Sequence, residues 1–151
     1  MRAYFDSAVL VKAYCLETTT PQALALIRLA APPIAFTQLH SLEIRNALRL
    51  KRHRKELTAS QLRGSLRALR EDIAGGFLDA PELDLYAVYL RADMLSERHA
   101  VSTGARTLDI LHVAAASILA VDRFVSFDRR QRSVAVRAGM EVMPRTLPRA
   151  S

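Results

Sequence analysis

Two aspartates each directly follow a short apolar run that is typical of a β-strand. Asp6 comes after RAYF at 2–5, and Asp128 comes after RFVSF at 123–127. In a parallel sheet, catalytic and binding groups gather at the carboxyl ends of the strands. We therefore expect Asp6 and Asp128 to stand at one edge of a sheet, although either residue alone can also serve as the N-cap of the helix that follows it.

A third aspartate, Asp109, lies inside the stretch RTLDILHVAAA at 106–116, which has the composition of a buried helix. Its helical face also carries His112 and several small residues. We expect the carboxylate to point inward near the helix start, where the helix dipole also favours an acid. A buried carboxylate either acquires a partner or becomes protonated.

The fourth acid, Glu43, falls within a segment of helical periodicity. On a helical wheel it shares a stripe with Leu42 and Leu50, which we take as the face toward the core. The alternative is that a second stripe, carrying Ile44 and Leu48, is the buried one and that Glu43 is solvated.

Four carboxylates at one sheet edge would repel one another. Each pair of charges 4 Å apart costs about 1 kcal/mol in water and about 4 kcal/mol at an effective dielectric of 20. A cation relieves this repulsion, and an all-oxygen ligand set without cysteine or paired histidine selects Mg²⁺ or Mn²⁺. Such an ion activates water and neutralises charge on a phosphate. The acids therefore predict phosphodiester hydrolysis.

Apolar runs and segments of helical periodicity alternate along the chain, which predicts an α/β fold with a mostly parallel sheet. We find no linker, repeat or low-complexity tract, so residues 1–151 are expected to form a single domain. The expected strands are 2–5, 34–37, 77–80, 123–127 and 141–143, and the expected helices are 7–16, 20–31, 38–54, 58–74, 85–99, 107–120 and 129–138.

The chain is basic, with 22 Lys and Arg against 15 Asp and Glu and a formal net charge of +7. This balance favours a polyanionic partner, although solubility alone can also explain it. The apolar runs are too short for a membrane span of about 20 residues, and the start of the sequence does not resemble a secretory signal, so we expect a cytoplasmic protein. The single cysteine, Cys15, is interpreted as a buried small hydrophobe.

Several basic residues lie near the acids in sequence and are candidates for contact with an RNA backbone or for charge stabilisation. A solvated helix end is the alternative explanation for the run KRHRK at 51–55. No aromatic cluster accompanies these residues, so base stacking is not supported. The candidates are Arg45, Arg49, Lys51, Arg52, Arg129, Arg130 and Arg132. His112 is a tempting general base, but we interpret it as a hydrogen-bonded core residue.

The acids in these contexts resemble the PIN domain family, and more closely the VapC-type toxin ribonucleases of toxin–antitoxin pairs. The resemblance covers nearly the whole chain, except that residues 56–84 carry no motif. The matching stretches are AYFDSAVLVKAY, SLEIRNAL, TGARTLDILHVAAA and FVSFDRRQ, the last with Ser126 two residues before Asp128.

The resemblance implies a PIN-like three-layer α/β/α sandwich with a mostly parallel central sheet. It also implies that the protein is a Mg²⁺-dependent (or Mn²⁺-dependent) endoribonuclease that acts as a toxin. It further implies an RNA substrate, a cognate antitoxin, a homodimer and no membrane association. Ile44, Leu48 and the first helices are candidate contact surfaces. The implied site consists of Asp6, Asp109 and Asp128 as metal ligands, Glu43 as the fourth catalytic acid, and Ser126 holding the loop or a water beside Asp128.

Two alternative classes of protein have similar folds. The first is a phosphoaspartyl phosphatase or a receiver domain. A phosphatase of this kind has Asp-x-Asp after the first strand, whereas this chain has Asp6-Ser7-Ala8, and the acidic pair and late lysine of a receiver domain are not seen in this sequence. A non-catalytic RNA-binding or partner-binding module is expected to lack one or more of the acids, and here all four are present.

Overall fold

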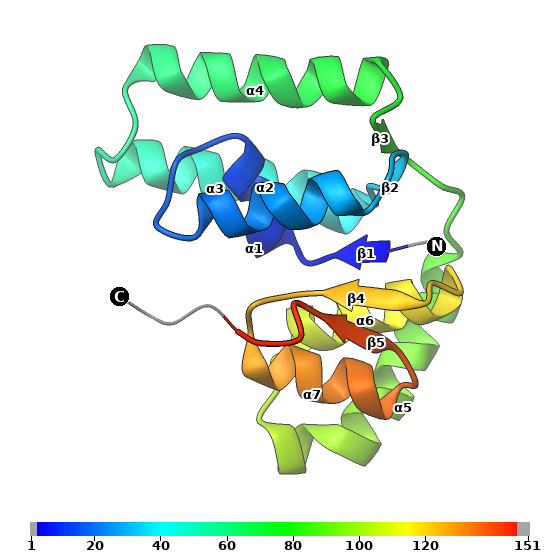
Figure 1. The fold of residues 1–151 in the computed structure, drawn as a ribbon. Coiled ribbons are helices and arrows are strands. Elements are labelled where there is room, and N and C mark those ends of the chain that lie inside the picture. Colours follow the sequence, from blue (N-terminus) through cyan, green and yellow to red (C-terminus); the bar gives the residue numbers. More distant parts are fainter. Residues whose placement is uncertain (1–2, 148–151) are drawn as a thin grey trace. The chain divides into compact units, whose positions relative to one another are not determined.

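The computed structural model describes residues 3–147, which form two compact units. Residues 3–6 and 82–147 make up the first, which we call the sheet unit, and residues 7–81 make up the second, the helical unit. Figure 1 shows the elements of both. Arg2, the first residue of the expected strand 2–5, lies outside the described residues. The expectation of a single domain stays a prediction.

The sheet unit is built on three parallel strands in the order β1–β4–β5. Phe5 of β1 pairs with Val125 of β4, which pairs with Met143 of β5. Tyr4 and Phe5 of β1 and Phe124 and Val125 of β4 are buried, and Tyr4 stacks on Phe124 with ring centroids 5.7 Å apart. The strands are β1 (Ala3–Phe5), β4 (Arg123–Val125) and β5 (Glu141–Met143).

Three helices complete the sheet unit and pack against one another, and Figure 1 labels them α5, α6 and α7. The middle helix is buried without a break from Ile110 to Ala116, because its alanine run offers small side chains that allow close packing. Gly104 ends the preceding helix in the left-handed conformation, with a φ of 66°. The helices are α5 (Leu85–Thr103), α6 (Thr107–Ile118) and α7 (Arg129–Arg137).

The helical unit contains four α-helices, a short 3-10 helix and a pair of parallel strands. Capping boxes begin the two long helices, with Thr37 and His40 at one and Thr58 and Gln61 at the other. The elements are α1 (Ser7–Leu10), η1 (Val11–Ala13), α2 (Thr20–Leu29), β2 (Ile34–Ala35), α3 (Gln38–His53), α4 (Ala59–Ala74) and β3 (Leu78–Asp79).

The predicted core face of α3 is wrong. Ile44 and Leu48 are fully buried, whereas Leu42 is 67% exposed and Leu50 is 41% exposed. His40, which the capping box ties to the helix start, is buried on the same face as Ile44. Both stripes fit a helical period, so packing against the rest of the unit decided between them. Ile44 and Leu48 therefore cannot form the partner surface that we expected.

Most element boundaries agree with expectation to within about two residues, and two differ by more. The first helix was expected to reach residue 16, but its α-helical part stops at Leu10 and the 3-10 helix at Ala13. Tyr14 is held there by α4, because its hydroxyl donates to Asp72 at 2.7 Å and its carbonyl accepts from Ser65 at 2.6 Å. The expected helix 85–99 instead continues to Thr103. Among the residues described, no helix has the length and apolar character needed to cross a membrane.

Candidate active site

Asp6 stands at the carboxyl end of β1, as its sequence position predicts. Its backbone N–H donates to the carbonyl of Val125 at 2.8 Å, which extends the pairing of β1 with β4. The side chain is buried, and its Oδ1 accepts a hydrogen bond from Gln131 Nε2 at 3.3 Å. His112 Nε2 lies 4.0 Å from the same oxygen.

Asp128 follows the end of the neighbouring strand β4 and caps α7. Its Oδ1 accepts from the backbone N–H groups of Arg130 at 2.7 Å and Gln131 at 3.1 Å. Ser126 is fully buried, and its Oγ accepts from the Asp128 N–H at 3.0 Å. Because β1 and β4 are adjacent and parallel, Asp6 and Asp128 belong to the same sheet edge.

Gln131 connects these two aspartates and was missed as a site residue from sequence. Its backbone N–H donates a hydrogen bond to Asp128 and its side-chain amide donates one to Asp6. The residue is 1% exposed. Exchanging its amide N and O would place two acceptors against each other, so the amide orientation is fixed by Asp6. Its buried Oε1 has no hydrogen-bond partner among the described residues. The sequence feature that could have identified Gln131 is its position, a polar residue three places after a capping aspartate.

Asp109 is half-buried near the start of α6, so the expectation that its carboxylate is buried is wrong. Its Oδ2 accepts from the backbone N–H of Arg106 at 2.9 Å, which completes a helix cap. His112 lies one turn further on, fully inside, with its Nδ1 2.9 Å from the Tyr4 hydroxyl. Residues three apart on a helix are neighbours, so Asp109 lies one turn before His112, whose Nε2 is 4.0 Å from Asp6 Oδ1.

Glu43 belongs to the helical unit and is half-buried on α3. Its carboxylate accepts a hydrogen bond from the hydroxyl of Ser7 at 2.8 Å. Ser7 is the residue that follows Asp6 in the chain. The participation of Glu43 in a set of four acids stays a prediction.

The donor chemistry of this edge suits a hard cation, because carboxylate oxygens are the preferred ligands of Mg²⁺ and Mn²⁺. However, within residues 3–147 no three His, Cys, Asp or Glu side chains are grouped closely enough to hold a metal ion. Asp6, Asp109 and Asp128 instead accept hydrogen bonds from the protein itself. The ligand type therefore fits a metal, while the arrangement is not a preformed metal centre.

Lys51, expected to contact RNA, is held by acids instead. Its Nζ lies 2.8 Å from Glu17 and 3.2 Å from Glu56, and Lys12 also pairs with Glu17. Burial alone would raise the pKa of Glu17, but hydrogen bonds from Lys12 and Lys51 lower it below its usual value. The hydrogen bond with Glu17 raises the pKa of Lys51. A phosphate would have to displace two carboxylates, so we remove Lys51 from the RNA-contact candidates.

Arg132 has a structural role, which makes it a less suitable RNA contact than the exposed arginines. It is buried, and its guanidinium donates to the carbonyls of Ser126 at 3.0 Å and Pro144 at 2.7 Å. Burial lowers the pKa of this guanidinium. Arg132 therefore ties the loop after β4 to the segment after β5.

The remaining basic candidates are accessible to different degrees. Arg45 is half-buried and donates to Ser41 at 3.1 Å, and Arg130 Nη2 lies 3.8 Å from Asp128. The exposed candidates are Arg49, Arg52 and Arg129.

Comparison with known proteins identifies a shared fold. No protein-family model and no curated protein matches the chain. Among solved structures, the crystal structure of FitAcB from Neisseria gonorrhoeae is similar, with a TM-score of 0.61 and 14% sequence identity, over 94% of this chain and 96% of the other. This likeness and the parallel strands confirm the predicted α/β, PIN-like fold class.

Proposed function

We propose that the chain is a metal-dependent endoribonuclease and the toxin of a toxin–antitoxin pair. The observation that carries the proposal is the pairing at the sheet edge: Asp6 and Asp128 share Gln131. Asp109 lies on α6 one turn before His112, whose Nε2 is 4.0 Å from Asp6. The fold shared with FitAcB, which agrees with the fold that the resemblance to VapC-type toxins implies, supports the proposal. The net charge of +7 suits a polyanionic substrate.

The proposed cofactor is Mg²⁺ or Mn²⁺, with Asp6, Asp109 and Asp128 as its ligands and Glu43 as the fourth catalytic acid. When bound, such an ion lowers the pKa of a water molecule and neutralises charge on the phosphate. Asp109 and Asp128 each cap a helix N-terminus with one carboxylate oxygen. Each carboxylate has two oxygens, so one can stay on the cap while the other binds.

The surrounding residues hold these acids in place. Gln131 donates to Asp6 Oδ1, which fixes one face of that carboxylate. Ser126 accepts from the Asp128 backbone and so fixes the loop that carries it. Arg129 and Arg130 begin α7 directly after Asp128, where a phosphate group would meet positive charge.

The proposed partners are RNA, a cognate antitoxin protein and a second copy of the chain. A toxin must be held inactive until needed, so an antitoxin that covers the acids or their approach is part of the proposal. The homodimer rests only on the resemblance to VapC-type toxins.

An RNA cleavage assay tests the activity. Purified protein should cut total RNA with Mg²⁺ or Mn²⁺ and not with EDTA. Asp109→Asn should lose at least about 100-fold in rate, beyond the loss expected for a residue that only supports a ligand. Asp122→Asn, an exposed aspartate in the same unit, is the matched control and should cut normally. Cleavage that survives EDTA would refute the proposal.

A growth assay tests the toxin role separately. Expression of the wild-type chain should arrest a bacterial culture, and expression of Asp109→Asn to the same level should not. Equal growth of the two cultures would reject the toxin role while leaving the nuclease activity to be judged by the cleavage assay.

A further inference from the structure

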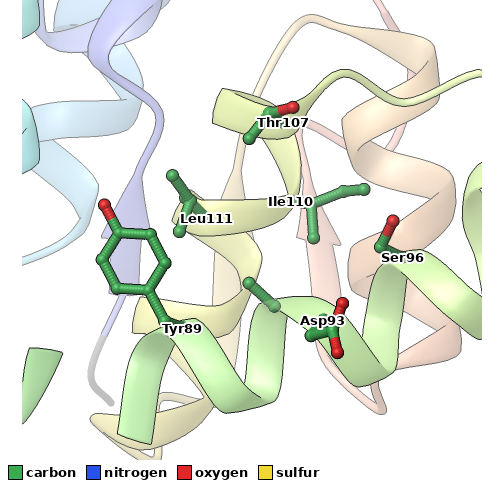
Figure 2. Close-up of a pocket in the computed structure, with 7 residues that line it drawn as sticks. Tyr89, Asp93, Ser96, Thr107, Ile110 and Leu111 are labelled. Carbon is green, nitrogen blue, oxygen red and sulfur yellow. The ribbon is translucent and has the colours of Figure 1, made fainter. Parts of the chain in front are cut away.

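A pocket of about 210 Å³ lies between α5 and α6 in the sheet unit. Figure 2 shows Tyr89, Asp93 and Ser96 on α5 facing Thr107, Ile110 and Leu111 on α6. Ala92 completes the lining. None of these side chains belongs to the acids of the proposed active site.

The lining combines one carboxylate with apolar and aromatic walls. Asp93 is exposed, and its side chain makes no hydrogen bond or ion pair with any residue in the described part of the chain. Ala92, Ile110 and Leu111 are buried and form an apolar floor. An anionic or purely apolar ligand would leave the Asp93 carboxylate covered and unpaired, which is unfavourable. The pocket therefore favours a cation that has an apolar stem.

The lining also distinguishes among cations. The ring of Tyr89 offers a face on which a planar guanidinium can stack. A guanidinium carries five N–H donors, which suits the carboxylate of Asp93 together with the hydroxyls of Ser96 and Thr107. An ammonium group has three donors and no plane, so arginine matches this lining better than lysine does.

The size of the pocket and the residues beside it indicate whether the guanidinium belongs to a small molecule or to a polypeptide. The volume is below the roughly 300–1,000 Å³ of pockets that enclose a drug-sized ligand, so it suits a single long side chain. Tyr86, Leu90 and Met94 continue along the adjoining face of α5 and are 74%, 52% and 43% exposed. A free small molecule would leave this apolar stripe in water, whereas a polypeptide anchored in the pocket would cover it.

We propose that this pocket binds an arginine side chain of a protein partner, whose neighbouring residues lie on the stripe formed by Tyr86, Leu90 and Met94. The stem of the arginine crosses Ala92, Ile110 and Leu111, and the guanidinium reaches Asp93. This site is independent of the proposed nuclease activity and stands even if the chain cuts no RNA.

Titration of the ¹⁵N-labelled full chain with short peptides tests the site. The probe is acetyl-Leu-Ala-Arg-Ala-Leu-amide, and its control carries citrulline, which has the shape of arginine without the charge. The arginine peptide should shift amide signals within 89–96 and 107–111 and bind about fivefold more tightly than the control, the effect of one partly exposed charge pair. Equal binding of the two peptides would overturn the proposal.

Two further experiments test whether Asp93 provides the charge that recognises arginine and whether the arginine belongs to a polypeptide. Asp93→Asn should remove the arginine preference, whereas Glu97→Gln, an equal charge change at an exposed site on the same helix, should keep it. Both variants alter exposed side chains, and their melting temperatures check the fold. Free butylguanidine should bind more weakly than the arginine peptide. If Asp93→Asn keeps the preference, or if butylguanidine binds as tightly as the peptide, a partner's arginine is not the ligand.

Discussion

Gln131 is the residue whose environment most needs an explanation. A fully buried amide normally satisfies both its donor and its acceptor, and an unpaired acceptor costs stability. Gln131 uses its donor on Asp6 and has no partner for Oε1 within the described residues. Such a group is retained where it serves a site, so we interpret Gln131 as a positioning residue for Asp6.

Replacing Gln131 tests this role. Gln131→Met keeps the length of the side chain but removes the hydrogen bond to Asp6, and we expect about 10-fold to 100-fold lower RNA cleavage, as for other groups that orient a ligand. The melting temperature should change little, because an unsatisfied buried acceptor is removed at the same time. Gln38→Met, at an exposed glutamine, is the control. An unchanged cleavage rate in Gln131→Met would contradict the role.

Sequence reasoning located the strand-end aspartates because their positions depend on local pattern. Asp6 and Asp128 each follow an apolar strand, and parallel pairing then places both at one edge. The burial of Asp109 is less than expected, because a helix-start acid can cap the helix or be enclosed by the core, and the choice depends on tertiary packing. Gln131 was missed because nothing in its local pattern separates a site residue from a cap residue.

At the scale of elements, salt-bridged residues join the segment after η1 to the end of α3. Lys12 and Lys51 lower the pKa of Glu17 below its usual 4.5, and Glu17 raises the pKa of Lys51 above its usual 10.5. A lowered carboxyl pKa contributes stability above the unfolded value, and this stability is lost as the pH falls through the folded value. The raised lysine pKa contributes stability that is lost as the pH rises through its folded value.

Urea unfolding at several pH values tests this cluster. Between about pH 5 and pH 3 the wild-type chain should lose more stability than Glu17→Gln, because the variant lacks the carboxylate that becomes protonated. Glu82→Gln, at an exposed glutamate, should behave like the wild type. Identical acid-side slopes for wild type and Glu17→Gln would contradict the pKa assignment.

The long helix α4 depends on its cap. The hydroxyl oxygen of Thr58 accepts from the Gln61 N–H at 3.1 Å, and the side-chain oxygen Oε1 of Gln61 accepts from the Thr58 N–H at 2.8 Å. Thr58→Ala should destabilise the chain by about 1 kcal/mol and lower the melting temperature by about 2–4 °C. Ser60→Ala, two positions along and also exposed, should have a smaller effect. Equal melting temperatures for Thr58→Ala and wild type would show that the cap contributes nothing.

Helix and strand positions followed the sequence pattern more closely than helix faces did. Alternating apolar runs and cap signals predicted the approximate location of each of the helices and strands in the described residues. The buried face of α3 was ambiguous, because Leu42–Leu50 and Ile44–Leu48 both have helical spacing. The early end of the first helix depends on the bonds from Tyr14 to Asp72 and Ser65, which join residues far apart in sequence.

At the scale of the whole molecule, a basic chain carries two distinct acidic features. Asp6, Asp109 and Asp128 mark the sheet edge proposed to act on RNA, and Asp93 marks the pocket proposed to hold an arginine. The net charge of +7 attracts polyanions over a long range. The acids therefore provide the local chemistry, while the overall charge favours encounter with the proposed substrate.

The most direct test of this account is where Mn²⁺ binds. Mn²⁺ is paramagnetic, so sub-stoichiometric amounts should broaden the amide signals of the ¹⁵N-labelled chain around residues 6, 109, 128 and 131, and Mg²⁺ should reverse the broadening by competition. Asp6→Asn should abolish the effect and Asp122→Asn should not. Broadening elsewhere in the chain, or an unchanged pattern in Asp6→Asn, would contradict the claim that these aspartates hold the metal.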